Sequence, residues 1–278
     1  MTTSTLLSLF ALPLALLLAG AVAGLTSGLF GVGGGFVVVP VLLLVSSLFG
    51  EPGPHDLRVA IGTSLATIVV TSLRSVQAHH RRGAVDFGIL RGWAPWLLLG
   101  VLGGLMIAGR ANTDTLLLLF ATGVLLYAFY FLRPEFVVRR EKHFALPVGL
   151  GRAALGSGLA GFSALLGIGG GAPFVVTMVV CGRPVHEAVA TAAGVGCLIA
   201  LPGTIGFMLL GLGESGLPPG SLGYVNVPAF AAIAAASAVT APLGARWAHA
   251  LSALHLRRAF GLYLLVISAF MFNKYLAS

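Results

Sequence analysis

Charged residues are scarce in this chain: only 9% of its 278 residues are Asp, Glu, Lys or Arg, whereas 58% are hydrophobic. A water-soluble domain normally carries about 25% charged residues, so these polar groups are too few to cover a soluble surface. Long apolar runs separated by short polar breaks instead indicate helices that cross a membrane. No polar stretch is long enough to form a separate soluble domain.

Cysteine and acidic residues are also few. Cys181 and Cys197 fall in or beside apolar segments without CxxC or Cys/His spacing, so we expect no disulfide, metal or cofactor. None of the 8 acidic residues lies in the middle of an apolar run, which disfavours a proton relay of carboxylates. No nucleophile and base stand at usable spacing, so we do not expect an enzyme.

The charges that are present are mostly basic, with a formal net charge of +8. In short loops such charges set membrane topology and contact anionic headgroups, so we expect a lipid bilayer and no nucleic acid as partner. Loops 79–86 and 133–143 carry basic clusters and are expected in the cytoplasm, whereas loop 211–222 carries none. This alternation predicts a multi-pass protein of the cell inner (plasma) membrane with both termini outside.

Ten hydrophobic runs are candidates for helical segments. A helix needs about 20 residues to cross the hydrocarbon core, and the second and seventh runs are shorter than that. We expect each short run to return from a hairpin that dips into the membrane. The runs are 5–30, 34–49, 59–78, 87–108, 115–132, 144–166, 172–181, 187–210, 223–245 and 256–276.

Two glycine clusters precede the short runs and look like copies of one another. They read Gly31-Val32-Gly33-Gly34-Gly35 and Gly167-Ile168-Gly169-Gly170-Gly171, and the second starts 136 residues after the first. Because glycine is unfavourable inside a helix, each cluster should break one. A helix that restarts there points free N–H groups at the turn. We predict an anion site at both clusters; close helix packing through small residues is the alternative.

Further matches indicate that the two halves form an inverted repeat. Residues 60–64 resemble 188–192, Asp86 and Asn226 stand at corresponding segment starts, and residues 104–120 parallel 244–260. Charge places the start of the first half outside and that of the second inside. We therefore expect an all-α polytopic membrane protein with two inverted-topology repeats of about five segments, whose glycine-broken hairpins meet near the midplane. The repeats are 1–133 and 144–278, and a cytoplasmic basic linker at 134–143 joins them.

Polar residues in the segments that follow the hairpins are further candidates for substrate binding. Thr63, Ser64 and Thr191 lie about one turn into these segments. They either line the same cavity or bond to the preceding carbonyl of their own helix. Arg74 has no counterpart in the second half; it either extends to the headgroups or selects anions at the cytoplasmic mouth.

The arrangement of these motifs resembles the TauE/SafE family of membrane permeases. The residues that carry the resemblance are the glycine-rich turn within 24–40, the Ala-x-Gly-Thr-Ser stretch at 60–64, the basic loop 79–82 and the second copy at 165–171. The resemblance implies an exporter of sulfite or small organic sulfonates, hence a small anionic substrate. Ala192 replaces the second Ser of the repeat, which breaks the symmetry of such a site.

Export also agrees with the membrane potential, which is worth about 2.3 kcal/mol per charge per 100 mV and drives an anion outward. Uptake would need a coupled ion. A passive pore for small neutral solutes is the alternative function. The sequence leaves open which sulfur-containing anion moves, whether protons move with it, and whether the protein is a monomer or a homodimer.

Overall fold

The computed structural model describes residues 3–49, 53–133, 145–248 and 253–276. Within them the chain forms ten helices and one two-stranded antiparallel sheet. The predicted linker 134–143, with its basic residues, lies outside the described residues. The elements are α1 (Thr3–Phe30), α2 (Gly35–Phe49), α3 (Asp56–His80), α4 (Phe87–Arg110), α5 (Thr113–Leu132), α7 (Gly149–Leu166), α8 (Gly171–Val180), α9 (Val185–Leu210), β1 (Ser221–Leu222), β2 (Val225–Asn226), α10 (Val227–Trp247) and α11 (Ala253–Leu276).

The helices have the lengths and surfaces of membrane spans. Seven of them are long and apolar enough to cross a bilayer, and two shorter apolar helices start at the glycine clusters. At 1.5 Å per residue the ten residues of α8 reach about 15 Å, which is half of the hydrocarbon core. Large apolar side chains such as Met106, Leu126 and Val239 are exposed, as expected of a surface that faces lipid. The predicted class, an all-α polytopic membrane protein, is confirmed.

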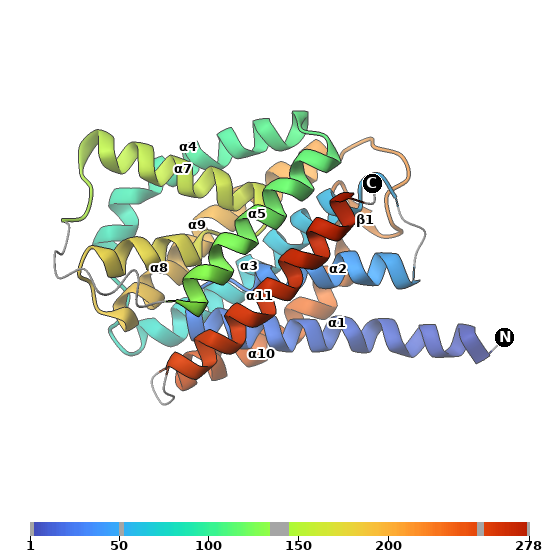
Figure 1. Cartoon of the computed structure of the whole chain (residues 1–278), viewed down its shortest axis with the longest axis horizontal. Helices are drawn as coiled ribbons and strands as arrows, with labels where there is room; N and C mark the ends of the chain where they lie inside the picture. Colours follow the sequence, from blue (N-terminus) through green and yellow to red (C-terminus); the bar gives the residue numbers. More distant parts are fainter. Residues whose placement is uncertain (1–2, 50–52, 134–144, 249–252, 277–278) are drawn as a thin grey trace.

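The helices pack in pairs that correspond between the two halves. The central helices α3 and α9 contact each other, and the pairs α1–α10 and α7–α4 lie along opposite flanks (Figure 1). The pair α5–α11 completes the bundle. Exchanging α1 with α7, α3 with α9, α4 with α10 and α5 with α11 leaves these four pairs unchanged, and the contact of α2 with α3 corresponds to that of α8 with α9. The packing is therefore that of two repeats, although the boundaries between them stay a prediction.

The two ends of the bundle are named here after the ends of α3. The Asp56 end also holds the starts of α5 and α10. The first described residues of α1 and the last described residues of α11 lie there too (Figure 1). The His80 end holds the starts of α4, α7 and α9. This grouping follows from contacts across loops: Arg58 donates to the carbonyl oxygen of Ala111 at one end, and Arg82 donates to that of Ala245 at the other.

One predicted segment begins later than expected. The run 223–245 was expected to be helical throughout, but its first residues form the hairpin of β1 and β2, in which Ser221 pairs with Asn226. The helix α10 starts only at Val227 because the Asn226 side chain accepts from the amide of Ala229, and a proline follows in the first turn. Asp86 caps α4 in the same way through the amide of Ile89, so the predicted correspondence of Asp86 and Asn226 is confirmed.

Candidate functional site

The two glycine clusters form turns of the same backbone shape. Gly31, Gly33 and Gly34 have φ of 67°, 77° and 81°, and Gly167, Gly169 and Gly170 have φ of 64°, 68° and 72°. Residues with a Cβ rarely adopt this left-handed conformation, which explains why glycine recurs at these positions in both halves. Each turn ends one helix and starts a short one, α2 at Gly35 and α8 at Gly171.

The two turns are in direct contact with each other. A Cβ at Gly35 would overlap the carbonyl oxygen of Gly167, and a Cβ at Gly171 would overlap that of Gly31. The side chain of Ile68 covers both, with its Cγ2 2.9 Å from a Cβ built at Gly33 and 2.8 Å from one built at Gly169. Ile68 is the middle residue of α3, so the turns meet at half the depth of the bundle, as predicted. They are buried, and close packing, the alternative interpretation, describes them in this conformation.

Unused hydrogen-bond donors gather at this contact. Among the described residues no backbone carbonyl accepts from the amides that follow the breaks, those of residues 33–35 and 169–171. Ser27 and Ser163 lie four residues before the first glycine of each turn; they are 1% and 0% exposed, and their hydroxyls have no partner within the described chain. Sequence reasoning missed both serines, although their separation equals that of the glycine clusters. Amides and hydroxyls can all donate to an anion.

Thr63 and Thr191 make equivalent bonds in the two halves. The Thr63 hydroxyl oxygen accepts from the amide of Asn226 at 2.9 Å, and that of Thr191 accepts from the amide of Asp86 at 3.0 Å. Each bond ties a central helix to the start of a helix from the other repeat. Both threonines are fully buried. Their predicted equivalence has a structural basis, and in this conformation their hydroxyls are engaged with backbone.

Two hydroxyls of α3 bind the glycine turns directly. Ser64 donates to the carbonyl oxygen of Gly167 at 2.7 Å, and Thr71 donates to that of Gly33 at 3.0 Å. The structure therefore places Ser64 at the turns, where its hydroxyl bonds to the other repeat and not to its own helix. Thr71 was missed because a hydroxyl within a helix usually bonds to its own backbone. On α9, the position that corresponds to Ser64 is Ala192, which has no hydroxyl.

Arg74 is not brought to the turns. Its side chain is exposed, and its Nε donates to the carbonyl oxygen of Ala238 on α10 at 3.2 Å. Ser75, the next residue, is buried, so Arg74 lies on another face of α3 than the buried polar residues. This geometry favours the interpretation of Arg74 as an arginine that reaches the headgroups rather than an anion selector.

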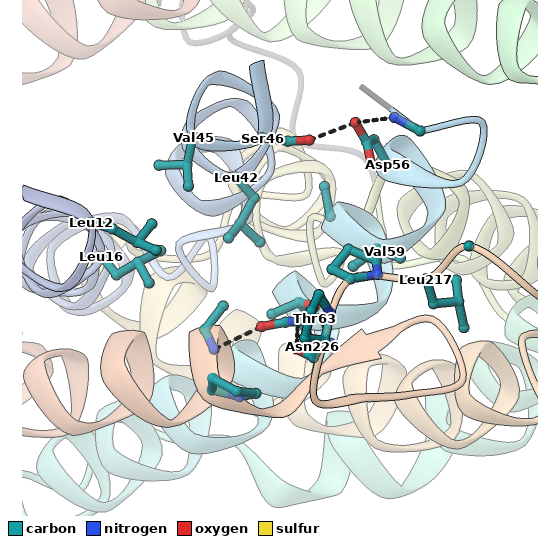
Figure 2. A pocket seen from close by; sticks show the side chains of 17 residues that line it. Leu12, Leu16, Leu42, Val45, Ser46, Asp56, Val59, Thr63, Leu217 and Asn226 are labelled. Carbon is teal, nitrogen blue, oxygen red and sulfur yellow. Dashed lines mark hydrogen bonds between the residues drawn. The ribbon is translucent and has the colours of Figure 1, made fainter. Parts of the chain in front are cut away.

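A cavity of about 550 Å³ opens at the Asp56 end (Figure 2). Its wall is mostly apolar, with side chains of α1 and α2, and its polar residues include Thr63, Asn226, Ser46 and Asp56. The Asp56 carboxylate accepts from the Ser46 hydroxyl at 2.5 Å and from the amide of Gly53 at 3.1 Å. Of the predicted site residues, Thr63 lines this cavity, while the turn glycines lie deeper.

Three residues of the cavity wall have counterparts at the His80 end. The repeat relation maps Ala60, Thr63 and Ala229 of the wall to Ala188, Thr191 and Ile89, and all six residues are buried. Arg183 pairs with two carboxylates at this end: its Nη1 lies 3.1 Å from an oxygen of Glu187 and its Nη2 lies 4.0 Å from one of Asp86. Trp93 packs edge-on against Phe174, with ring centroids 5.0 Å apart. Among the described residues, the His80 end thus holds ion pairs and packed rings, and the Asp56 end holds the cavity.

The site contains no arrangement for metal chemistry. In the part of the chain that the structure describes, no group of three or more His, Cys, Asp or Glu residues could hold a metal ion. Its chemistry is that of hydroxyls and backbone amides in a buried, uncharged setting. Such groups bind, and release, a solute that accepts hydrogen bonds.

Comparisons with known proteins agree on the kind of molecule. A family model described as "Sulfite exporter TauE/SafE" matches residues 16–271. A "probable membrane transporter protein" of Haemophilus influenzae is 34% identical over 96% of this chain and 100% of its own length. One with the same description from Methanocaldococcus jannaschii is 28% identical over 95% and 96%. No solved structure gives a significant match.

Proposed function

Because the chain belongs to the sulfite exporter TauE/SafE family and is a multi-pass membrane transporter, we propose that it exports sulfite or another small sulfur-containing oxyanion or organosulfonate from the cytoplasm. The proposed ligands of the anion are backbone amides of the two glycine turns. This assignment concerns the substrate and its site; membership of the family leaves both open.

The observation that carries the proposal is the excess of donors where the turns meet. Amides of both breaks and the hydroxyls of Ser27 and Ser163 have no acceptor within the described chain. Buried donors without partners are costly, and an anion would satisfy several at once, with about 1.5–3 kcal/mol from each charge-assisted bond. A neutral solute would gain less from such bonds, and a cation would meet donors rather than acceptors.

Because the turns touch each other in this conformation, the proposed site must open by movement of the repeats. The observed cavity ends at Thr63, which is five residues, or about 7.5 Å of helix rise, from Ile68 between the turns. Inverted repeats commonly alternate access by rocking about a fixed central site. The cavity at the Asp56 end supports this mode of transport.

The distribution of charge supports an orientation with the His80 end in the cytoplasm. Basic residues in short loops favour the cytoplasmic side. At the Asp56 end the described basic residues are fewer, namely Arg58, Arg110 and Lys274, whereas the His80 end holds Arg81, Arg82, Arg133, Arg152, Arg183, Arg246 and Arg258. In this orientation the observed cavity faces outward, and the Asp56 carboxylate in its wall would repel an anion and help its release.

Flux in proteoliposomes tests the function. Vesicles containing the protein are loaded in turn with sulfite, sulfate, thiosulfate, sulfoacetate, taurine or glycerol, and efflux and charge movement are recorded with and without a membrane potential. We expect saturable, electrogenic efflux of at least one sulfur-containing anion. Gly35→Val is the inactive control, because a side chain there overlaps the opposite turn. Passage of glycerol without charge movement would replace the proposal by the passive-pore alternative.

A further inference from the structure

A line of buried polar residues runs along α3 from the cavity to the His80 end. Its members recur every four residues, which keeps them near one face of a helix. None of them is more than 1% exposed. The line passes the glycine turns at its middle, where Thr71 binds Gly33. Its members are Thr63, Thr67, Thr71, Ser75 and His79, and Ser64 and Ser72 lie beside it.

The matching helix of the second repeat lacks this line. Beyond Thr191, the positions of α9 that correspond to Thr67, Thr71, Ser75 and His79 are occupied by Val195, Ile199, Gly203 and Phe207. The two helices hold equivalent places in the fold and pack against each other. The polar line beyond Thr63 is therefore a feature of α3 that the equivalent helix does not share.

Two hydroxyls, that of Ser75 in this line and that of Ser72 beside it, have no hydrogen-bond partner within the described residues. Ser72 and Ser75 are 0% exposed, and neither Oγ has a bond to protein. By contrast, Thr67 donates to the carbonyl oxygen of Thr63, in the manner usual for a hydroxyl in a helix. A buried hydroxyl without a bond is unfavourable, which points to a partner that is present during only part of the transport cycle.

Ser72 lies beside the second glycine turn, and Ser75 lies one turn of helix closer to the His80 end. The Oγ of Ser72 is 2.6 Å from a Cβ built at Gly196, and the carbonyl oxygen of Gly169 is 3.5 Å from the same point. Near the end of the line, His79 Nε2 is 3.3 Å from the carbonyl oxygen of Gly28 on α1. Ser72 and Ser75 thus lie between the turns and the basic end.

We propose that Ser72 and Ser75 line the cytoplasmic half of the substrate path and donate hydrogen bonds to the anion between the His80 end and the glycine turns. The path follows α3 of the first repeat and has no equivalent along α9. This inference rests on the proposed function, since it assumes that an oxyanion moves through the bundle. It adds the side chains of Ser72 and Ser75, on the cytoplasmic side of the turns, to the proposed backbone ligands of the anion.

Serine-to-alanine variants test the proposal in inside-out vesicles, where the cytoplasmic face is accessible. We expect S72A and S75A each to raise the half-saturation concentration for the transported anion about tenfold. The matched control is S237A on α10, because Ser237 is equally buried but donates to the carbonyl oxygen of Ala234 in its own helix. Thermal unfolding in detergent should be the same for all three variants. Unchanged half-saturation in both S72A and S75A would overturn the inference.

Accessibility provides a second measurement that does not depend on transport kinetics. S75C is placed in a background without the two native cysteines and is treated with a membrane-impermeant maleimide from either side, in the absence of substrate. Labelling from the cytoplasmic face and not from the outside supports a path. Absence of labelling from both sides, with unaltered S75A kinetics, refutes it. Absence of all anion flux in the wild type would instead refute the proposed function, and this inference with it.

Discussion

On the proposed alternating access, removing the charge of Arg183 should make the His80 end open more often. Arg183 pairs with Asp86 at the start of α4 and with Glu187, which precedes the buried Ala188. The side chains are 40%, 22% and 31% exposed, so solvent screens both ion pairs, and each contributes about 0.2–1 kcal/mol. The Arg183–Glu187 pair is local and persists in either conformation, so R183Q shifts the equilibrium only through the pair with Asp86, by about 0.2–1 kcal/mol. This raises the population of the open form by up to about fivefold.

The assay measures the form that is open at the His80 end, because the population of this minor form changes by the full factor while that of the major form hardly changes. Ala188, which is 0% exposed, is replaced by cysteine in a protein without native cysteines. Inside-out vesicles are then treated with an impermeant maleimide, and the labelling rate is compared with and without R183Q. We expect the labelling rate to rise by up to about fivefold. The rise should be smaller at high salt, because salt already screens the exposed Arg183–Asp86 pair in the parent protein.

The control is R246Q, which removes an exposed charge at the same end of the bundle. It should leave the labelling rate of A188C unchanged. An equal rise in both variants would mean that net charge, and not the contacts of Arg183, sets the rate. No rise in R183Q would refute the assignment of these ion pairs to the closure of the His80 end.

Two further predictions concern orientation and packing. Cys181 at the His80 end should react with impermeant maleimide only in inside-out vesicles, and S215C, on an exposed loop at the Asp56 end, only in right-side-out ones; the reverse would invert the topology. Because burial raises the pKa of the Cys181 thiol, its labelling should be slow at neutral pH and faster as pH rises. T63V and T191V each leave a backbone N–H without its acceptor, at a cost of about 1–3 kcal/mol of unfolding free energy. The midpoint temperature of thermal unfolding in detergent should fall similarly for both variants, and an unchanged midpoint in either would contradict the bonds.

The helices could be predicted closely from the sequence because lipid imposes simple rules. Within lipid, apolar runs must be helical so that their backbone N–H and C=O groups are hydrogen-bonded. The length of each run decides whether it spans the membrane. The ten residues of α8 were therefore recognised as too few to cross. The start of α10 was misjudged because hydrophobicity does not distinguish an apolar hairpin from a helix. Asn226 and the proline after it held the information on where the helix begins.

The site could be predicted in part. Glycines with positive φ were recognisable, because runs of glycine are unfavourable within a helix. That the turns would touch each other was not, since it depends on how far two hairpins enter the bundle. The direction of Arg74 also required the structure: a helix turns about 100° per residue, and only the neighbours of α3 show that Ser75 faces inward while Arg74 does not.

The symmetry of the fold and the asymmetry of its polar residues have different consequences for transport. Equivalent helix pairs allow the same packing to form with either end open, which alternating access requires. If both central helices were equally polar, an anion would meet the same affinity in each half. In the proposed orientation, the hydroxyls on α3 beside the cytoplasmic half and the carboxylate of Asp56 at the other end would make binding favourable on the cytoplasmic side and release favourable on the outside. The membrane potential would act in the same direction on the proposed anion, so its export would need no further coupled ion.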